Sequence, residues 1–283
     1  MSGPSKAVLI TGCSSGIGAA TAKRLLGSGW TVYATARRVE SIAELQAAGA
    51  RTLALDVTDE DSMKAAVDAV EREEGAVGVL INNAGYSQSG AIETVPIEAV
   101  RRQFETNVFG LVRLTQLALP KMRAQRWGKI VNVGSMGGRL TFPGGGHYHA
   151  TKHALEAISD ALRFELRGFG IDVILLEPGL IITDFGEAAD ASMAATTTSG
   201  EDPYGQFNAA VGSLTKGAYE GPMRRLAASP ERVASVIERA ITRSRAPSRV
   251  KIAPSARMMI ATHGLLSDRA WDAAMRRQFP QPK

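Results

Sequence analysis

The stretch Thr11-Gly12-Cys13-Ser14-Ser15-Gly16-Ile17-Gly18 stands between a short apolar run at residues 7–11 and an amphipathic segment at residues 17–26. The apolar run predicts a β-strand and the amphipathic segment predicts a helix. Glycine permits a tight turn here and lets a ligand approach the backbone closely. The start of the helix offers unpaired N–H groups and the positive end of the helix dipole, which favour a phosphate. The stretch therefore predicts a strand, a phosphate-binding loop and a helix, although its glycine spacing differs from the GxGxxG fingerprint.

The same alternation of apolar runs and helical patterns continues along the chain. Further strands are predicted at residues 31–36, 51–57, 77–82, 129–134, 171–177 and 249–253. Helices are predicted at residues 62–74, 97–123, 150–167 and 230–244. Continuously apolar strands suit a parallel sheet whose two faces are both covered, and right-handed crossovers place helices on both. The sequence therefore predicts an α/β fold, a doubly wound parallel sheet of the Rossmann type, over residues 1–253.

Two segments do not follow this alternation. Residues 183–222 are rich in Ala, Ser, Thr and Gly with scattered large apolar side chains. A stretch this long between regular elements is commonly a lid or binding loop, or is disordered; we expect a lid or loop that covers the substrate. Residues 254–283 form a C-terminal tail to which the sequence assigns no structure or role.

Composition excludes several classes of protein. Of 283 residues, 45% are apolar and 22% charged, as in ordinary globular proteins and unlike disordered chains. The single cysteine, Cys13, cannot form an internal disulfide, which favours a reducing, cytoplasmic setting. No transmembrane segment or signal peptide is predicted, because the longest apolar stretch is interrupted by two carboxylates and a proline. Residues 223–283 are basic, but they lack interleaved aromatic residues and zinc-ligand spacing, so neither a nucleic-acid partner nor a metal is expected.

The end of the second predicted strand bears on the choice of dinucleotide. In NAD sites an acidic side chain at this place binds the ribose 2′-OH. Here the strand ends in Thr35-Ala36-Arg37-Arg38, without an acid. A guanidinium group can bind a 2′-phosphate in bidentate fashion, and Ser14 offers a further hydroxyl donor. We expect NADP(H) in preference to NAD(H); the alternative is that both arginines are solvated turn residues.

A second pair of residues indicates proton transfer. Tyr148 and Lys152 are four residues apart and share one face of a helix. A phenol with its ordinary pKa near 10 is a poor base at neutral pH. A neighbouring ammonium favours the phenolate, so the sequence predicts that Lys152 lowers the pKa of Tyr148.

These motifs occur in an order that resembles the short-chain dehydrogenase/reductase family over about residues 5–253. Residues 11–18 resemble its TGxxxGxG loop, and Asn82-Asn83-Ala84-Gly85 resembles its NNAG turn. Pro178-Gly179, followed by Thr183, resembles its nicotinamide-binding PGxxxT segment. The resemblance implies a cofactor-binding set made up of Gly12, Ser14, Ser15, Gly16, Ile17, Gly18, Arg37, Asp56, Val57, Asn83, Ala84, Gly85, Tyr148, Lys152, Pro178, Gly179, Ile181 and Thr183.

The resemblance also implies four catalytic residues, Asn107, Ser135, Tyr148 and Lys152. Tyr148 would exchange a proton with the substrate oxygen, which Ser135 would hold by a hydrogen bond. Lys152 would bind the nicotinamide ribose. Asn107 would hold a water that links Lys152 to solvent; it can also bend its helix through backbone hydrogen bonds.

Some residues depart from the family pattern or remain open. Gly134 replaces the first of two serines that often precede the catalytic loop. His147 and His149 flank Tyr148, and at most one of them can reach the substrate; we expect packing or a place at the substrate rim. For Cys13 we expect a small packed side chain and not a redox-sensitive thiol.

The function expected from these features is hydride transfer between NADP(H) and a carbonyl or secondary alcohol. Apolar residues within 185–223 favour a lipophilic substrate, and the chain most resembles the branch holding 17β-hydroxysteroid and retinol dehydrogenases. The alternatives are an NADP(H)-binding sensor without turnover, or an epimerase or dehydratase on the same fold. The predicted helices 97–123 and 150–167 each carry more than one apolar stripe, so a homodimer or homotetramer is expected, in line with the family's habit.

Overall fold

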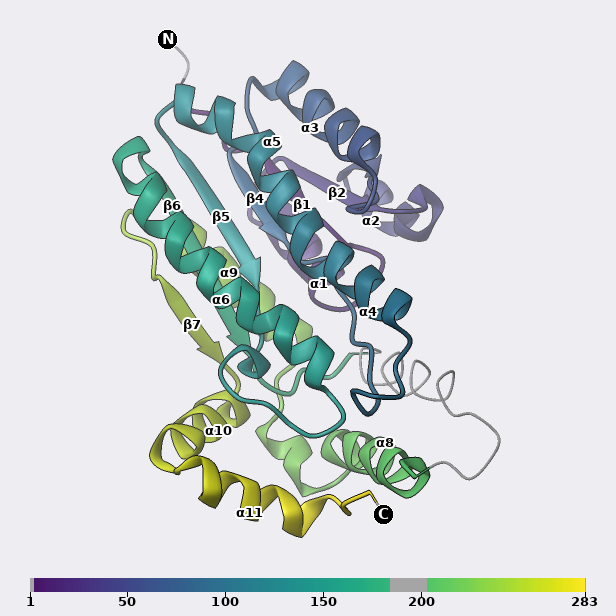
Figure 1. Ribbon diagram of the computed structural model, residues 1–283. Helices are drawn as coiled ribbons and strands as arrows, with labels where there is room; N and C mark the ends of the chain where they lie inside the picture. Colours follow the sequence, from purple (N-terminus) through teal and green to yellow (C-terminus); the bar gives the residue numbers. More distant parts are fainter. Residues whose placement is uncertain (1–2, 184–202, 283) are drawn as a thin grey trace.

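Parallel strands form the centre of the computed structural model, which describes residues 3–183 and 203–282 (Figure 1). The strands of the described chain are β1 (Val8–Ile10), β2 (Val32–Ala36), β3 (Arg51–Ala54), β4 (Val79–Asn82), β5 (Gly128–Val133), β6 (Ile171–Pro178) and β7 (Arg249–Ile252). They pair in the order β3-β2-β1-β4-β5-β6-β7, and every pairing is parallel. The order reverses between β1 and β4, which confirms the predicted doubly wound sheet and creates a crevice at that point.

Helices cover both faces of this sheet (Figure 1). The helices of the described chain are α1 (Gly16–Gly27), α2 (Ala43–Ala47), α3 (Glu60–Glu74), α4 (Ile97–Phe104), α5 (Gly110–Ala124), α6 (Gly146–Leu166), α8 (Gly205–Glu220), α9 (Pro230–Thr242), α10 (Pro254–Leu265) and α11 (Asp268–Gln278). Of these, α8, α10 and α11 lie beyond the carboxyl ends of the strands and not on a face of the sheet (Figure 1). Successive residues of a strand point to opposite faces. In β1, Val8 and Ile10 pack with α1 and α9, whereas Leu9 packs with α3, α5 and α6.

The helix predicted at residues 97–123 is interrupted. Residues Glu105–Phe109 form a π-helical turn between α4 and α5, and Asn107 lies within it. A π-helical turn within an α-helix is often found at a functional site. The uninterrupted helix was therefore wrong in detail, and the turn coincides with a predicted site residue.

The segments that the sequence left open contain regular structure. In α11, Trp271 and Met275 pack against Leu140 and Ile260, and Trp271 Nε1 donates a hydrogen bond to the carbonyl of Thr141 at 3.3 Å. The C-terminal helices therefore fasten onto the chain that follows β5 (Figure 1). Of the predicted substrate lid, residues 184–202 lie outside the described residues, and α8 occupies much of the remainder.

In residues 3–183 and 203–282, no helix combines the length and apolar character needed to cross a bilayer.

Candidate active site

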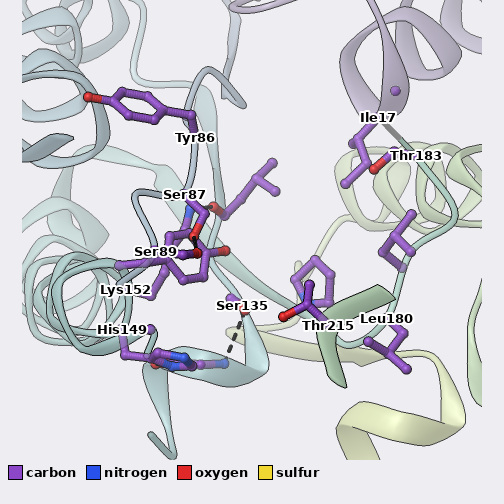
Figure 2. A pocket seen from close by; sticks show the side chains of 18 of the residues that line it. Ile17, Tyr86, Ser87, Ser89, Ser135, His149, Lys152, Leu180, Thr183 and Thr215 are labelled. Atoms are coloured by element: carbon purple, nitrogen blue, oxygen red, sulfur yellow. Dashed lines mark hydrogen bonds between the residues drawn. The ribbon is translucent and has the colours of Figure 1, made fainter. Parts of the chain in front are cut away.

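A cavity of about 1900 Å³ opens at the carboxyl ends of the strands, where parallel sheets of this topology bind ligands. It is larger than the roughly 300–1,000 Å³ of ordinary small-molecule sites, so a dinucleotide and a substrate fit together. Figure 2 shows Ile17 of α1 and Thr183 on one side, with His149 and Lys152 of α6 on the other.

The phosphate-binding loop is shaped by close backbone contacts. Gly12 has φ +70°, and a Cβ on Gly18 would lie 2.2 Å from the carbonyl oxygen of Gly12. Ser15, the N-cap of α1, makes no side-chain cap hydrogen bond, and the first turn holds no acidic residue. The first N–H groups of α1 thus remain available to an anion, and this cradle fits the pyrophosphate of a dinucleotide. Gly18 shapes the loop without lining the cavity, whereas Gly12, Ser14, Ser15, Gly16 and Ile17 line it.

The far end of the cavity is polar and basic. Arg37, Arg38, Asp56, Val57 and Thr58 line it. Asp56 Oδ1 accepts hydrogen bonds from Thr58 N at 2.9 Å and from Thr58 Oγ1 at 2.8 Å, which holds the turn after β3. Both arginine side chains are exposed here. Both guanidinium groups therefore border the cavity and are open to a ligand that enters this end of it.

Two asparagines hold the loops that border the cavity. Asn83 Nδ2 donates to the carbonyls of Thr11 and Gly12, at 2.9 and 3.0 Å. Asn107 Nδ2 donates to the carbonyl of Tyr86 at 2.9 Å and to Thr151 Oγ1 at 3.1 Å, and its Oδ1 accepts from Tyr86 N. Asn107 is buried and does not line the cavity. These bonds tie Asn107 to the chain after β4 and to α6, and not to the backbone of its own helix; the water-holding role stays a prediction.

Ser135, Tyr148 and Lys152 come together at the wall opposite the phosphate loop. Burial raises the pKa of Tyr148 to about 12, while its hydrogen bond with Ser135 acts in the opposite direction. Lys152 Nζ lies 5.7 Å from the centroid of the Tyr148 ring and donates to the carbonyl of Val133 at 2.8 Å. Burial lowers the pKa of Lys152 to about 8. The expectation that Lys152 lowers the pKa of Tyr148 is therefore not met in this structure, because desolvation of the phenolate is the larger effect.

The residues predicted to contact the nicotinamide form a segment held by hydrogen bonds. Pro178, Gly179, Ile181 and Thr183 line the cavity. Gly179 N donates to the carbonyl of Ile252 at 2.9 Å. A Cβ added to Gly16 would lie 3.3 Å from Thr183 Cγ2, so Thr183 closes over the start of α1. Ala84 and Gly85 complete the lining on the other side of the crevice.

The histidines and the cysteine have packing roles. His149 Nδ1 lies 3.1 Å from the carbonyls of both Gly137 and Leu140, and its ring packs edge-on against Phe142 and Tyr148. It also borders the cavity, whereas His147 does not. Cys13 is buried, and burial raises the pKa of its thiol to about 12. The packed thiol predicted for Cys13 is confirmed.

Part of the cavity wall was missed by sequence reasoning. The missed residues come from the chain after β4 and β5, from the turn Pro222–Leu226 and from the C-terminal segment: Ser87, Ser89, Met136, Phe142, Met223, Met258, Met259 and Phe279. Four further lining residues belong to α8, inside the predicted lid: Val211, Leu214, Thr215 and Tyr219. Scattered apolar side chains gave a signal for α8. The local sequence of the C-terminal helices gave no sign that they line the cavity, because only their packing against the chain after β5 brings them there. Tyr219 lies near enough to Tyr148 to influence its pKa.

The family follows from this geometry and from the likeness to known proteins. Residues 6–194 match the family model for short chain dehydrogenase, and this chain belongs to the short-chain dehydrogenase/reductase family. A 3-ketodihydrosphingosine reductase of Bacteroides thetaiotaomicron is 36% identical over 90% of each chain. An NADPH-dependent 3-dehydrocapnine reductase of Ornithobacterium rhinotracheale is 35% identical over 93% of this chain and 94% of that one.

Solved structures show the same relationship. A short-chain dehydrogenase from Streptomyces avermitilis superimposes with a TM-score of 0.80 at 36% identity, covering 98% of this chain and 96% of the other. A serine dehydrogenase complexed with NADP+ gives 0.75 at 27% identity, over 88% and 94%. A family member from Burkholderia phymatum in complex with NAD gives 0.78 at 25% identity, over 99% and 98%. The fold is therefore that of an oxidoreductase that binds a nicotinamide cofactor.

Replacing Lys152 by Met is expected to increase the free energy of unfolding at pH 7 by roughly 1–3 kcal/mol, because a buried ammonium is costly. The pKa of Lys152 is about 8 in the folded protein against an ordinary 10.5. Below pH 8 the amine is protonated in both the folded and the unfolded protein, so the full destabilisation is present. As the pH rises from 8 toward 10.5, the buried amine loses its proton and the destabilisation disappears. Urea unfolding at pH 7 and pH 10 measures the difference, with the exposed Lys64→Met as control. A Lys152→Met protein less stable than wild type at pH 7 would contradict the prediction.

Proposed function

We propose that this protein is an NADP(H)-dependent reductase of lipophilic ketones or aldehydes, working through Ser135, Tyr148 and Lys152. The observation that carries the proposal is the hydrogen-bonded Ser135–Tyr148 pair at the wall of a cavity that also contains the phosphate loop and the Pro178–Thr183 segment. The three side chains supply what carbonyl reduction needs from a protein, namely two hydroxyl groups for one oxygen and a nearby cation.

The bound nicotinamide would supply the hydride. As a carbonyl oxygen gains negative charge, the Ser135 and Tyr148 hydroxyls donate hydrogen bonds to it, and Tyr148 Oη then gives up its proton. A pKa of about 12 keeps the phenol protonated at neutral pH, so it is ready to act as an acid and poorly suited to act as a base. The Lys152 ammonium, 5.7 Å from the ring, stabilises the phenolate that remains. These features favour reduction over alcohol oxidation.

The substrate wall supports a lipophilic substrate. Its side chains are largely apolar, with methionines at positions 136, 223, 258 and 259. Methionine fits irregular apolar shapes because its side chain is unbranched and flexible. The relatives named as reductases of 3-ketodihydrosphingosine and 3-dehydrocapnine agree with reduction of a ketone. The buried, free Cys13 thiol agrees with a cytoplasmic setting, which is part of the proposal.

Turnover by the Tyr148→Phe variant tests the reaction. The substitution should reduce kcat by about 10²-fold or more, because it removes the proton donor, while NADPH binding stays near that of wild type. Oxidation of NADPH and of NADH is followed with steroid, retinoid, fatty and small polar carbonyls. Tyr204→Phe, which removes a phenol bonded to Glu93, is the control. Binding of NADPH without turnover of any substrate would favour the sensor, and substrate conversion without net NADPH oxidation would favour an epimerase or dehydratase.

Cofactor choice is tested at Arg37. Arg37→Asp should raise the KM for NADPH by roughly 10–100-fold, because it removes a charge-assisted bond to the 2′-phosphate and adds a repelling charge. The KM for NADH should stay the same or fall. Lys23→Asp, on the exposed side of α1, controls for the change in net charge. Equal losses with both cofactors would refute the assignment of Arg37.

Assembly into a homodimer or homotetramer through α5 and α6 is also proposed. Phe109, just before α5, is 54% exposed, and Phe164 on α6 is 88% exposed; burying these two large apolar side chains against a second copy would stabilise the assembly. Light scattering should give a mass at least twice 30.0 kDa, and Phe164→Glu should lower it. Leu265→Glu, at an exposed position of α10, should not. A wild-type mass of one chain at all concentrations would exclude assembly.

A further inference from the structure

Two buried glutamates lie behind the catalytic residues, outside the cavity lining. Glu177, the next-to-last residue of β6, is fully buried, and Glu156 of α6 is nearly so. Within the described chain, neither oxygen of Glu177 and only one oxygen of Glu156 has a hydrogen-bond partner. Burying a carboxylate is costly unless opposite charge compensates it.

Two arginines provide that compensation. Arg139 Nη1 lies 3.8 Å from both Glu156 Oε2 and Glu177 Oε1. Arg249 Nε lies 3.1 Å from Glu156 Oε2 and 3.6 Å from Glu177 Oε1. Each arginine therefore bridges both glutamates. We call these four residues the carboxylate clasp.

The clasp joins the segments that carry the catalytic residues. Arg139 directly follows the turn Met136–Gly138, which begins after Ser135. Glu156 lies one helical turn after Lys152 on α6. The turn and the helix touch closely, since a Cβ on Gly138 would lie 3.1 Å from Glu156 Oε1.

The other half of the clasp reaches the nicotinamide segment. Glu177 immediately precedes Pro178 and Gly179, which line the cavity. Arg249 begins β7, which runs beside the end of β6 and ends at Ile252, whose carbonyl accepts from Gly179 N at 2.9 Å. Just beyond, Ser255 Oγ accepts from Leu180 N at 3.0 Å. The clasp thus spans the two sides of the site that must be aligned.

We propose that the carboxylate clasp is a positioning device that fixes Ser135 and Lys152 relative to the Pro178–Thr183 segment, so that hydride and proton reach the same carbonyl; this rests on the proposed function. A purely structural role explains the arrangement less well, because apolar residues of similar volume stabilise a protein interior at least as effectively as buried ion pairs. Arg139 is nearly half exposed, yet it points at two buried carboxylates. What the four charges add is a fixed geometry among three segments of the site.

Glu177→Gln keeps the size of the side chain and removes the charge that both arginines share. We expect about 10-fold weaker binding of NADPH, measured by nicotinamide fluorescence, and an unchanged affinity for 2′-phospho-ADP-ribose, which lacks the nicotinamide. We also expect kcat to fall by about 10-fold, with the KM for the ketone changed less than twofold. Equal weakening of both ligands would indicate general damage to the fold and would overturn the proposal, as would wild-type affinity for both.

A second test uses Arg139, whose side chain is partly exposed, so that a substitution there does not alter a fully buried position. Arg139→Met should reproduce the selective loss of NADPH affinity, and Arg139→Lys should restore part of it, because the cation is retained. Arg101→Met is the matched control, since Arg101 is exposed and pairs with Glu98 within α4. Lysine no better than methionine would overturn the proposal. If wild type binds NADPH but reduces no carbonyl, the proposed function fails, while the comparison of NADPH with its fragment still tests the clasp.

Discussion

The approach of α1 to the loop before it is the constraint on which the site depends. A side chain at position 18 would place its Cβ 2.2 Å from the carbonyl oxygen of Gly12, so the helix can pack this closely only on glycine. Because it does, the uncapped N-terminus of α1 faces the crevice between β1 and β4. Asn83 then fastens the same loop to the turn after β4. A short contact between backbones thereby decides where an anion binds and from which side the rest of the site must approach.

Much of this arrangement could be predicted because it depends on local patterns. Every predicted strand is present, since runs such as residues 79–81 are apolar without interruption. The π-helical turn around Asn107 could not be predicted, because it is stabilised by contacts with Tyr86 and Thr151 far away in the sequence. The same limit applies to α11, which is short and carries Trp271 and Met275 as its buried residues.

The pKa values of Tyr148 and Lys152 could not be predicted from their spacing in the sequence either. The helical spacing of Tyr148 and Lys152 brings the two side chains near each other, but it says nothing of how much water surrounds them. In the structure both are desolvated, so burial favours the neutral phenol and the neutral amine. A site of this kind gives up stability for function, since the buried Lys152 ammonium is expensive to desolvate even with its hydrogen bond to the Val133 carbonyl. Tyr148 therefore keeps its proton at neutral pH, and a protonated phenol is the form that can give a proton to a carbonyl oxygen.

The two parts of the site are therefore built under different constraints. Ser135, Tyr148, Lys152 and the nicotinamide segment lie at the ends of β5 and β6 or on α6, and buried hydrogen bonds and ion pairs fix their positions. The substrate wall comes largely from α8 and from the C-terminal helices. These helices are held at the cavity mainly by apolar packing, such as that of Trp271 against Leu140, with few hydrogen bonds beside it. Apolar packing tolerates exchange of one side chain for another of similar volume, whereas a buried charge does not tolerate loss of its partner. The wall can consequently change with the substrate while the chemistry of the site stays the same. For this reason the motifs of this chain indicate the class of reaction far better than they indicate the substrate.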